Sequence, residues 1–220
     1  MLKKIVTKIS RILWRNISQI VYQFFIRIPY FHFIRNTVGN QNPCTFSTWF
    51  MQKVLGFNRK VYWPVHFSSR INLPENISVG IDTCPGIAPG CYIQGVGSVR
   101  IGNYTQVAQN VGIVSMNHDI YNLPKHDATT VDVSIGDYCW IGMNSVILPG
   151  VVLGDFTIIG AGAVVTKSFP EGHCVIAGNP AKILRKLDKE KCVRHEVNGK
   201  YFGYIKAEKF DSFRKNKLWF

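Results

Sequence analysis

The stretch SMNHDIYNLPKHDATT, residues 115–130, gathers ionisable side chains that could do acid–base chemistry. It holds His118 and His126, and Asn117 and Asp119 flank the first of these histidines. A neutral imidazole with an ordinary pKa of about 6.5 can take a proton from a hydroxyl near neutral pH. An acceptor at its other ring nitrogen, either Asp119 or a backbone carbonyl of the loop, would fix the tautomer. A single loop histidine is more often a solvated bystander, so the surrounding sequence decides its role.

Regular repeats surround this stretch. From residue 135 the sequence divides into sixes as IGDYCW IGMNSV ILPGVV LGDFTI IGAGAV VTKSFP, and upstream as IGNYTQ VAQNVG IVSMNH. The first position of each six is aliphatic: Ile101, Val107, Ile113, Ile135, Ile141, Ile147, Leu153, Ile159 and Val165. This period is neither the alternation of a strand nor the 3.6 residues of a helix. It predicts a solenoid of short strands and turns, in which each aliphatic side chain stacks on the one a full coil away.

The repeat is interrupted where the histidines lie. Ile113 and Ile135 are 22 positions apart, which is not a multiple of six. The segment 115–132 is therefore predicted to leave the solenoid as a loop and rejoin it. Loops carried on a rigid scaffold are frequent places for reactive groups.

These repeats resemble the hexapeptide-repeat acyltransferases, over roughly residues 77–187 and including VIAGNPAKILRKL at the end. NHDIYNLPKH followed by IGDYCWIG is most similar to the sugar O-acetyltransferases of bacterial surface-polysaccharide clusters. The resemblance, and not the period, implies a left-handed parallel β-helix and a homotrimer with sites between subunits. We expect a mainly β fold in which this domain spans 76–187. An N-terminal basic amphipathic region, 1–75, would precede it, and a hairpin and helix extension, 188–220, would follow.

The resemblance also assigns roles around the loop. The catalytic histidine of the family stands at the start of this loop, and His118 matches that position, with Asn117 and Asp119 beside it. The family uses acetyl-CoA, and the acceptor hydroxyl attacks the thioester directly. A backbone amide near Met143 would stabilise the oxyanion. No Ser or Cys is placed as a nucleophile beside His118, so no acyl-enzyme is expected.

The donor would lie in a groove between neighbouring subunits. Exposed backbone amides of Gly-rich coils can bind its pantetheine arm, and lysines can meet its phosphates as point charges. The matching positions are Trp140, Gly142, Met143, Ala161 and Gly162 along the arm, and Thr166, Lys167 and Lys182 toward the nucleotide. Some relatives have Ser where this chain has Met143, so a side-chain hydroxyl is lacking there. Packing is the alternative role for Trp140, and a solvated surface is the alternative for Lys167 and Lys182.

The acceptor should face the same groove. In PGCYIQGVGS, residues 89–98, Tyr92 and Gln94 are candidate sugar contacts, and His126 is a third. A metal site is not expected. Zinc-binding relatives use three histidines, whereas His118 and His126 lie within one loop and His173 is in a different segment, so no third ligand falls in register.

The net charge of +13 is unevenly distributed. Residues 1–75 carry +10, residues 76–182 carry −3 and residues 183–220 carry +6. The start, MLKKIVTKISRILWRNISQIVYQFFIRIPYFHFIR, has aliphatic residues at helical spacing and unbalanced basic residues opposite them, and Pro29 should end or kink the helix. This pattern favours a helix lying in the headgroup region of an anionic membrane, with packing on the domain's own core as the alternative. Arginines interrupt any signal-peptide core, and no stretch is apolar enough to span a bilayer. Nucleic acid is not an expected partner because no recognised binding motif is present.

The C-terminal tail begins after Leu187. The sequence VNGK between RHE and YFGYI predicts a hairpin with its turn at Asn-Gly, and AEKFDSFRKNKLWF predicts a short basic amphipathic helix. Basic tails at both ends could hold one face of a trimer against a membrane. Packing of the tail on a neighbouring subunit is the alternative.

The sequence thus predicts an O-acetyltransferase acting on a cell-surface glycan or its lipid-linked precursor. Six scattered cysteines without a C-x-x-C pair suit free thiols in a reducing cytosol, so we expect a cytoplasmic protein on the inner face of the membrane. One alternative is an acetyltransferase for a small soluble acceptor such as serine, a simple sugar or an antibiotic, which gives no reason for a membrane-seeking N-terminus. The other is a non-catalytic trimeric scaffold docked at the membrane, which the NHD and GNPAK segments disfavour.

Overall fold

A computed structural model describes residues 23–24, 27–126 and 132–219 of the chain. The amphipathic helix predicted at the N-terminus lies mostly outside these residues. Helical conformation is seen at Arg27, two residues before Pro29, where a helix end was predicted. Within the described ranges, no helix has both the length and the apolar character needed to cross a membrane.

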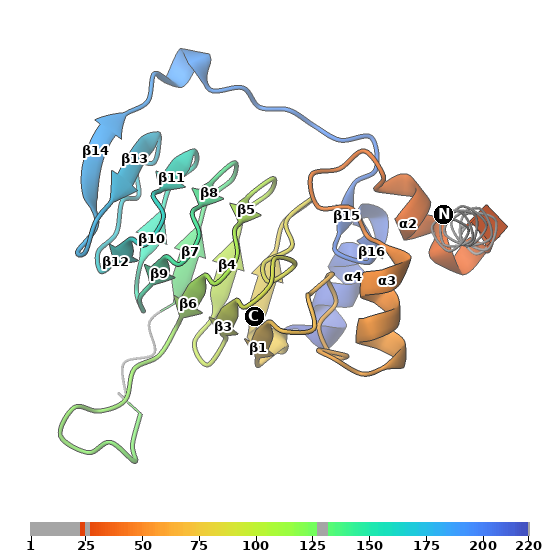
Figure 1. Cartoon of the computed structure of the whole chain (residues 1–220), viewed down its shortest axis with the longest axis horizontal. Helices are drawn as coiled ribbons and strands as arrows, with labels where there is room; N and C mark the ends of the chain where they lie inside the picture. The colour runs from red at the N-terminus through yellow and green to blue at the C-terminus, as the bar shows by residue number, and fades with distance from the viewer. Residues whose placement is uncertain (1–22, 25–26, 127–131, 220) are drawn as a thin grey trace, which may run out of the picture.

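The centre of the molecule is a parallel β-helix with three faces (Figure 1). The first face has the strands β1 (Arg70–Asn72), β3 (Tyr92–Gln94), β6 (Gly112–Val114), β9 (Val146–Ile147) and β12 (Val164–Val165). The second has β2 (Ile77–Val79), β4 (Val99–Ile101), β7 (Val133–Ile135) and β10 (Val152–Leu153). The third has β5 (Gln106–Val107), β8 (Trp140–Ile141), β11 (Thr157–Ile159) and β13 (Cys174–Ala177), closed by the antiparallel β14 (Lys182–Lys186). The first paired strand, β1, lies before residue 76.

The core is the column of aliphatic side chains that the six-residue period predicts. On the first face Ile93, Ile113, Ile147 and Val165 pair in register from coil to coil and have no exposed surface. The register between Ile113 and Ile147 is kept although the loop lies between them in sequence. The predicted loop is confirmed, because β6 ends at Val114 and β7 begins at Val133.

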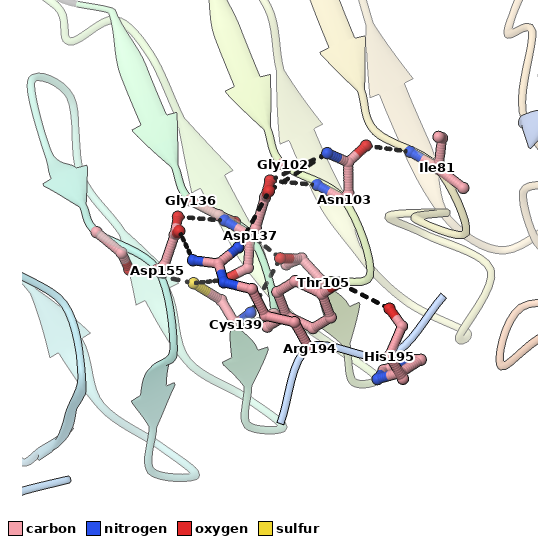
Figure 2. A network of polar contacts seen from close by, with 12 residues as sticks. Ile81, Gly102, Asn103, Thr105, Gly136, Asp137, Cys139, Asp155, Arg194 and His195 are labelled. Atoms are coloured by element: carbon pink, nitrogen blue, oxygen red, sulfur yellow. Dashed lines mark hydrogen bonds and ion pairs between the residues drawn. The ribbon is translucent and has the colours of Figure 1, made fainter. Parts of the chain in front are cut away.

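One edge of the β-helix carries a repeated side-chain ladder. In the sixes IGNYTQ, IGDYCW and LGDFTI, the polar third residue accepts a hydrogen bond from a backbone N–H one coil earlier. Asn103 Oδ1 accepts from Ile81, Asp137 Oδ1 accepts from Asn103 at 2.7 Å, and Asp155 Oδ1 accepts from Asp137 at 2.9 Å (Figure 2). Asp137 and Asp155 therefore accept hydrogen bonds from backbone N–H groups at the turns between strands.

A strap runs from β14 back along the β-helix to its N-terminal end (Figure 1). It contains η4 (Lys189–Lys191), and Arg194 fastens it to the ladder. The guanidinium forms an ion pair with Asp155 at 2.5 Å (Figure 2). It also lies over the rings of Tyr138 and Phe156, at 5.3 and 5.2 Å from their centroids. Burial alone would raise the pKa of Asp155, but hydrogen bonds from Arg194 and from the Asp137 N–H bring that pKa below its ordinary value.

The described helices before β1 and the last described elements of the chain lie together at the first coil (Figure 1). The N-terminal part forms η1 (Pro29–Phe31), α2 (His32–Asn36), α3 (Phe46–Trp49) and η2 (Phe50–Val54), and η3 (Pro74–Asn76) follows β1. The C-terminal part forms β15 (Tyr201–Phe202), β16 (Ile205–Lys206) and α4 (Ala207–Lys217). Phe31 and Phe33 are buried in one cluster with Tyr201, so these two aromatic residues pack on the chain's own core, as the alternative for this segment proposed.

The predicted C-terminal helix and hairpin are present, but the predicted position of the turn is wrong. The strands of the hairpin flank Gly203 and Tyr204, and Asn198-Gly199 precedes the hairpin. Gly203 has a φ of +58°, and a Cβ there would lie 2.4 Å from the Cα of Trp63. Only glycine fits this approach, so packing against the first coil places the turn. The hairpin and α4 also pack on the same chain through Phe210, which is buried.

Candidate functional site

The loop holds His118 in one orientation. The side chain is exposed, and its Nδ1 lies 2.8 Å from the carbonyl oxygen of Leu123. Because a carbonyl oxygen only accepts hydrogen bonds, Nδ1 carries the proton of the neutral ring. The lone pair is therefore on Nε2, which can accept a proton from a substrate.

Asp119 stabilises the loop and does not orient the histidine. Its Oδ1 accepts hydrogen bonds from the backbone N–H of Tyr121, at 2.8 Å, and of Asn122, at 3.1 Å. Of the two partners predicted for His118, the structure therefore selects the backbone carbonyl. Asn117 is exposed on the other side of the histidine.

His126 lies directly beside His118. The two rings are stacked with their centroids 4.9 Å apart and an interplanar angle of 24°, and the two residues form an isolated antiparallel β-bridge. The sequence offered His126 either as an acceptor contact or as part of the loop structure, and the structure places it against His118. Between the histidines, the loop exposes the apolar side chains of Ile120, Tyr121 and Leu123.

The candidate acceptor residues on β3 lie at the base of the loop, because β3 pairs with β6 and the loop follows β6. Gln94 Oε1 accepts a hydrogen bond from the backbone N–H of Met116 at 3.0 Å, which anchors the start of the loop. Tyr92 is partly exposed on the outer surface of the same strand. The structure thus places both residues near the start of the histidine loop.

The candidate donor residues occupy neighbouring coils on the third face. Trp140 is 56% exposed on β8, and Met143 is also exposed just after this strand. The next coil brings Ala161 and Gly162 beside them, and the Gly162 N–H donates to the Met143 carbonyl oxygen at 2.8 Å. A Cβ on Gly142 would lie 2.5 Å from the Ile159 carbonyl oxygen, so glycine allows the coils to stack closely here. This edge can present backbone to an extended ligand.

The residues predicted to bind the nucleotide end of acetyl-CoA do not all lie in one place. Lys167 lines a cavity of about 590 Å³ together with Lys186 and Lys189 at the C-terminal end of the β-helix. Thr166 is exposed beside Lys167, whereas Lys182, on β14, does not line this cavity. Lys186 and Lys189 were not singled out from the sequence, although the basic run after GNPAK was a visible signal.

Among the described residues, no group of three His, Cys, Asp or Glu side chains is placed to hold a metal ion. All six cysteines lie in that part of the chain and are free, and five are buried. Burial raises the pKa of Cys44 and Cys139 to about 12, which makes these thiols unreactive at neutral pH.

Comparisons with known proteins agree with this architecture. The family model described as bacterial transferase hexapeptide (six repeats) matches residues 132–167. A maltose O-acetyltransferase from Clostridium difficile 630 is similar in structure, with 28% identity, 67% of this chain and 81% of that chain covered, and a TM-score of 0.51. A second similar structure is the hexapeptide-repeat acetyltransferase VCA0836 from Vibrio cholerae O1 biovar eltor, solved with acetyl-CoA. It is 19% identical over 74% of this chain and 92% of that chain, with a TM-score of 0.51, and this similarity is one of fold. No curated protein matches the chain in sequence. The predicted left-handed parallel β-helix of hexapeptide repeats is confirmed.

Proposed function

We propose that this chain, a hexapeptide-repeat acyltransferase of the left-handed β-helix fold, moves acetyl from acetyl-CoA to a sugar hydroxyl of a bacterial cell-surface glycan or its lipid-linked precursor. The observation that carries the proposal is the orientation of His118. Its Nδ1 is bound to the Leu123 carbonyl, so Nε2 is the basic nitrogen of an exposed ring. A base held in this way, on a loop carried by the β-helix, has the tautomer that general-base catalysis needs.

In the proposed reaction, His118 Nε2 accepts the proton of the sugar hydroxyl as the oxygen attacks the thioester carbonyl. Acetyl-CoA supplies that thioester. A backbone amide near Met143 donates to the oxyanion while the new C–O bond forms. His118 then returns its proton to the departing thiolate as the C–S bond breaks. Atoms and charges balance without an acyl-enzyme.

The residues present fit the acyl donor. Exposed Trp140 and the accessible backbone at Gly162, where a Cβ would meet nothing within 4 Å, suit a long ligand arm. Lys167, Lys186 and Lys189 around the cavity at the C-terminal end of the β-helix suit phosphates as point charges. We assign Trp140, Gly142, Met143, Ala161 and Gly162 to the arm, and Thr166, Lys167 and Lys182 to the nucleotide end.

The proposal includes a homotrimer with its sites between subunits, on the inner face of the cytoplasmic membrane. Free, buried cysteines support a reducing compartment. The excess of basic residues in the first 75 positions and after residue 182 supports contact with an anionic membrane surface.

A small soluble sugar is the second candidate acceptor, because the similar Clostridium difficile protein is described as a maltose O-acetyltransferase. Tyr92 and Gln94, at the base of the loop, and His126 are the residues assigned to acceptor contact in either case.

The test measures release of free CoA by mass spectrometry, with lipid-linked glycans and soluble sugars offered in parallel. His118→Ala should lower kcat by about 10²–10⁴-fold, the usual contribution of a positioned base. His66→Ala is the matched control, since this half-buried histidine lies in the N-terminal part of the chain and is hydrogen-bonded to Ser68. CoA release that depends on an acceptor but is unchanged in His118→Ala would remove His118 as the base. Tight acetyl-CoA binding without acceptor-dependent release would mean that the acceptor was not among those offered, whereas absence of acetyl-CoA binding would favour the scaffold.

A further inference from the structure

A second large cavity lies at the N-terminal end of the β-helix, between η1, η2 and α4. Its volume is about 730 Å³, within the range of small-molecule sites. Its walls are mainly aromatic and aliphatic, and include Phe33, Trp49, Tyr62, Phe213 and Leu218. No residue between 76 and 203 is among the described residues that line it, so it is separate from the site around His118.

The cavity carries an excess of positive charge. Lys53, Lys60 and Lys217 line it, against one carboxylate, Glu75. Lys53 is engaged by the carbonyl oxygens of Arg59 and Val61, at 2.8 and 2.6 Å. Lys60 and Lys217 are exposed, and neither forms an ion pair with another residue in the described part of the chain. Two ammonium groups therefore remain available to an anion at the rim of an apolar space.

Large apolar side chains are exposed around the same end of the molecule. Tyr30 is 61% and Trp219 is 73% exposed, and both also line the cavity. On η2 and just after it, Val54, Leu55 and Phe57 are exposed as well. Aromatic residues beside lysines are typical of surfaces that meet the boundary between lipid headgroups and acyl chains.

We propose that this cavity binds one anionic amphiphile, a phosphate carried on a hydrocarbon chain. The hydrocarbon lies among the aromatic walls, and the phosphate meets Lys60 and Lys217. Charge disfavours residues 1–22 as the occupant, because they contain five basic residues and no acid, which the lysines would repel. A neutral apolar ligand would leave both ammonium groups without a partner. The inference does not rest on the acetyl-transfer reaction.

The experiment titrates the full-length protein with decyl phosphate, below its micelle concentration, by isothermal calorimetry without any acyl donor. Decanol and inorganic phosphate are the parallel probes for the two halves of the ligand. The test variant is Lys60→Glu/Lys217→Glu. The matched control is Lys209→Glu/Lys215→Glu, which makes the same change of charge on α4 away from the cavity.

Saturable binding of about one decyl phosphate per chain, weakened about tenfold or more in the test variant and less than about twofold in the control, supports the site. Equal weakening in both variants would mean attraction to the overall charge and would overturn it. So would the absence of saturable binding, equal binding of decanol in all proteins, or displacement of the probe by a poly-glutamate peptide. If the test variant has a lower melting temperature, Lys60→Met/Lys217→Met replaces it. Failure here leaves the role of His118 untouched, because no acetyl transfer is measured.

Discussion

Replacing Arg194 by Met tests whether the strap is held by the side-chain ladder. The change removes the ion pair with Asp155 and the contacts with two aromatic rings, while it keeps most of the aliphatic length. The pair is partly solvated, because the Arg194 side chain is 53% exposed and that of Asp155 is 34% exposed. An exposed ion pair contributes about 0.2–1 kcal/mol, and each exposed cation–π contact about 0.5–1 kcal/mol. Since these contacts share one guanidinium, we expect a total loss of about 1–2 kcal/mol.

For a chain of this size, such a loss lowers Tm by about 2–8 °C. The assay is thermal unfolding at pH 7 and again at pH 3. The pKa of Asp155 is lowered in the folded state, so its contribution to stability is present above the unfolded pKa and is lost as the pH falls through the folded one. The difference between wild type and Arg194→Met should therefore shrink at pH 3.

The control is Lys191→Met, which removes an ion pair with Asp188 whose two side chains are largely exposed and which contacts no ring. It should leave Tm nearly unchanged. A Tm for Arg194→Met equal to that of the control would refute the ladder as the anchor of the strap, and a difference undiminished at pH 3 would assign the loss to the ring contacts alone.

Three further predictions concern the coils and the thiols. Gly142→Ala should lower the free energy of unfolding by about 1–3 kcal/mol, because the added Cβ would meet the backbone of the next coil. Gly112→Ala should lower it less, because the nearest atom to its Cβ would be 3.6 Å away. Equal urea midpoints for the two variants would contradict this. Ile147→Ala should lower the free energy of unfolding by about 2–5 kcal/mol, since this fully buried side chain stacks between two coils. In urea unfolding, a loss no larger than that of Val152→Ala, at an exposed position, would show a loosely packed core. A thiol reagent should modify Cys192 quickly in the native protein and the five buried cysteines only on unfolding, and a second fast thiol would be inconsistent with their burial.

The β-helix could be predicted because its contacts repeat at a fixed sequence distance. Ile113 and Ile147 are partners in space, and each has the same environment as every other first position of a six. A solenoid converts a long-range structure into a local pattern that one sequence displays. The loop was visible for the same reason, as a break in the phase.

The details of the loop were not predictable in this way. Asp119 and the backbone carbonyls of the loop were both within reach of His118 along the sequence. The choice depends on how the loop turns, because the backbone N–H groups of Tyr121 and Asn122 bind Asp119 and leave the Leu123 carbonyl for the ring. The stacking of His126 on His118 has the same origin. The residue types in the loop identified the candidate partners, and the conformation of the loop determines which of them contacts His118.

Contacts between segments far apart in the sequence were even harder to predict from local sequence patterns. Asn-Gly is a strong signal for a tight hairpin turn, yet the turn forms at Gly203, where the chain passes against Trp63. The pairing of Arg194 with Asp155 likewise joins residues 39 positions apart without any repeated pattern. In both cases the contact depends on the path of the strap, and the six-residue repeat carries no information about that path.

That path has an electrostatic consequence that the separate charge counts did not reveal. The strap returns the C-terminal segment to the first coil, where Phe210 and Phe213 pack near Tyr62, at 5.9 and 5.0 Å between ring centroids. Lys53 and Lys60 from the N-terminal part and Lys217 from α4 therefore meet around one cavity at this end of the β-helix. In the proposed contact with a membrane, this end of the molecule would face the anionic surface. The lysine-rimmed cavity lies at this same end, so a lipid bound there would leave the histidine loop on the coils that extend from the surface.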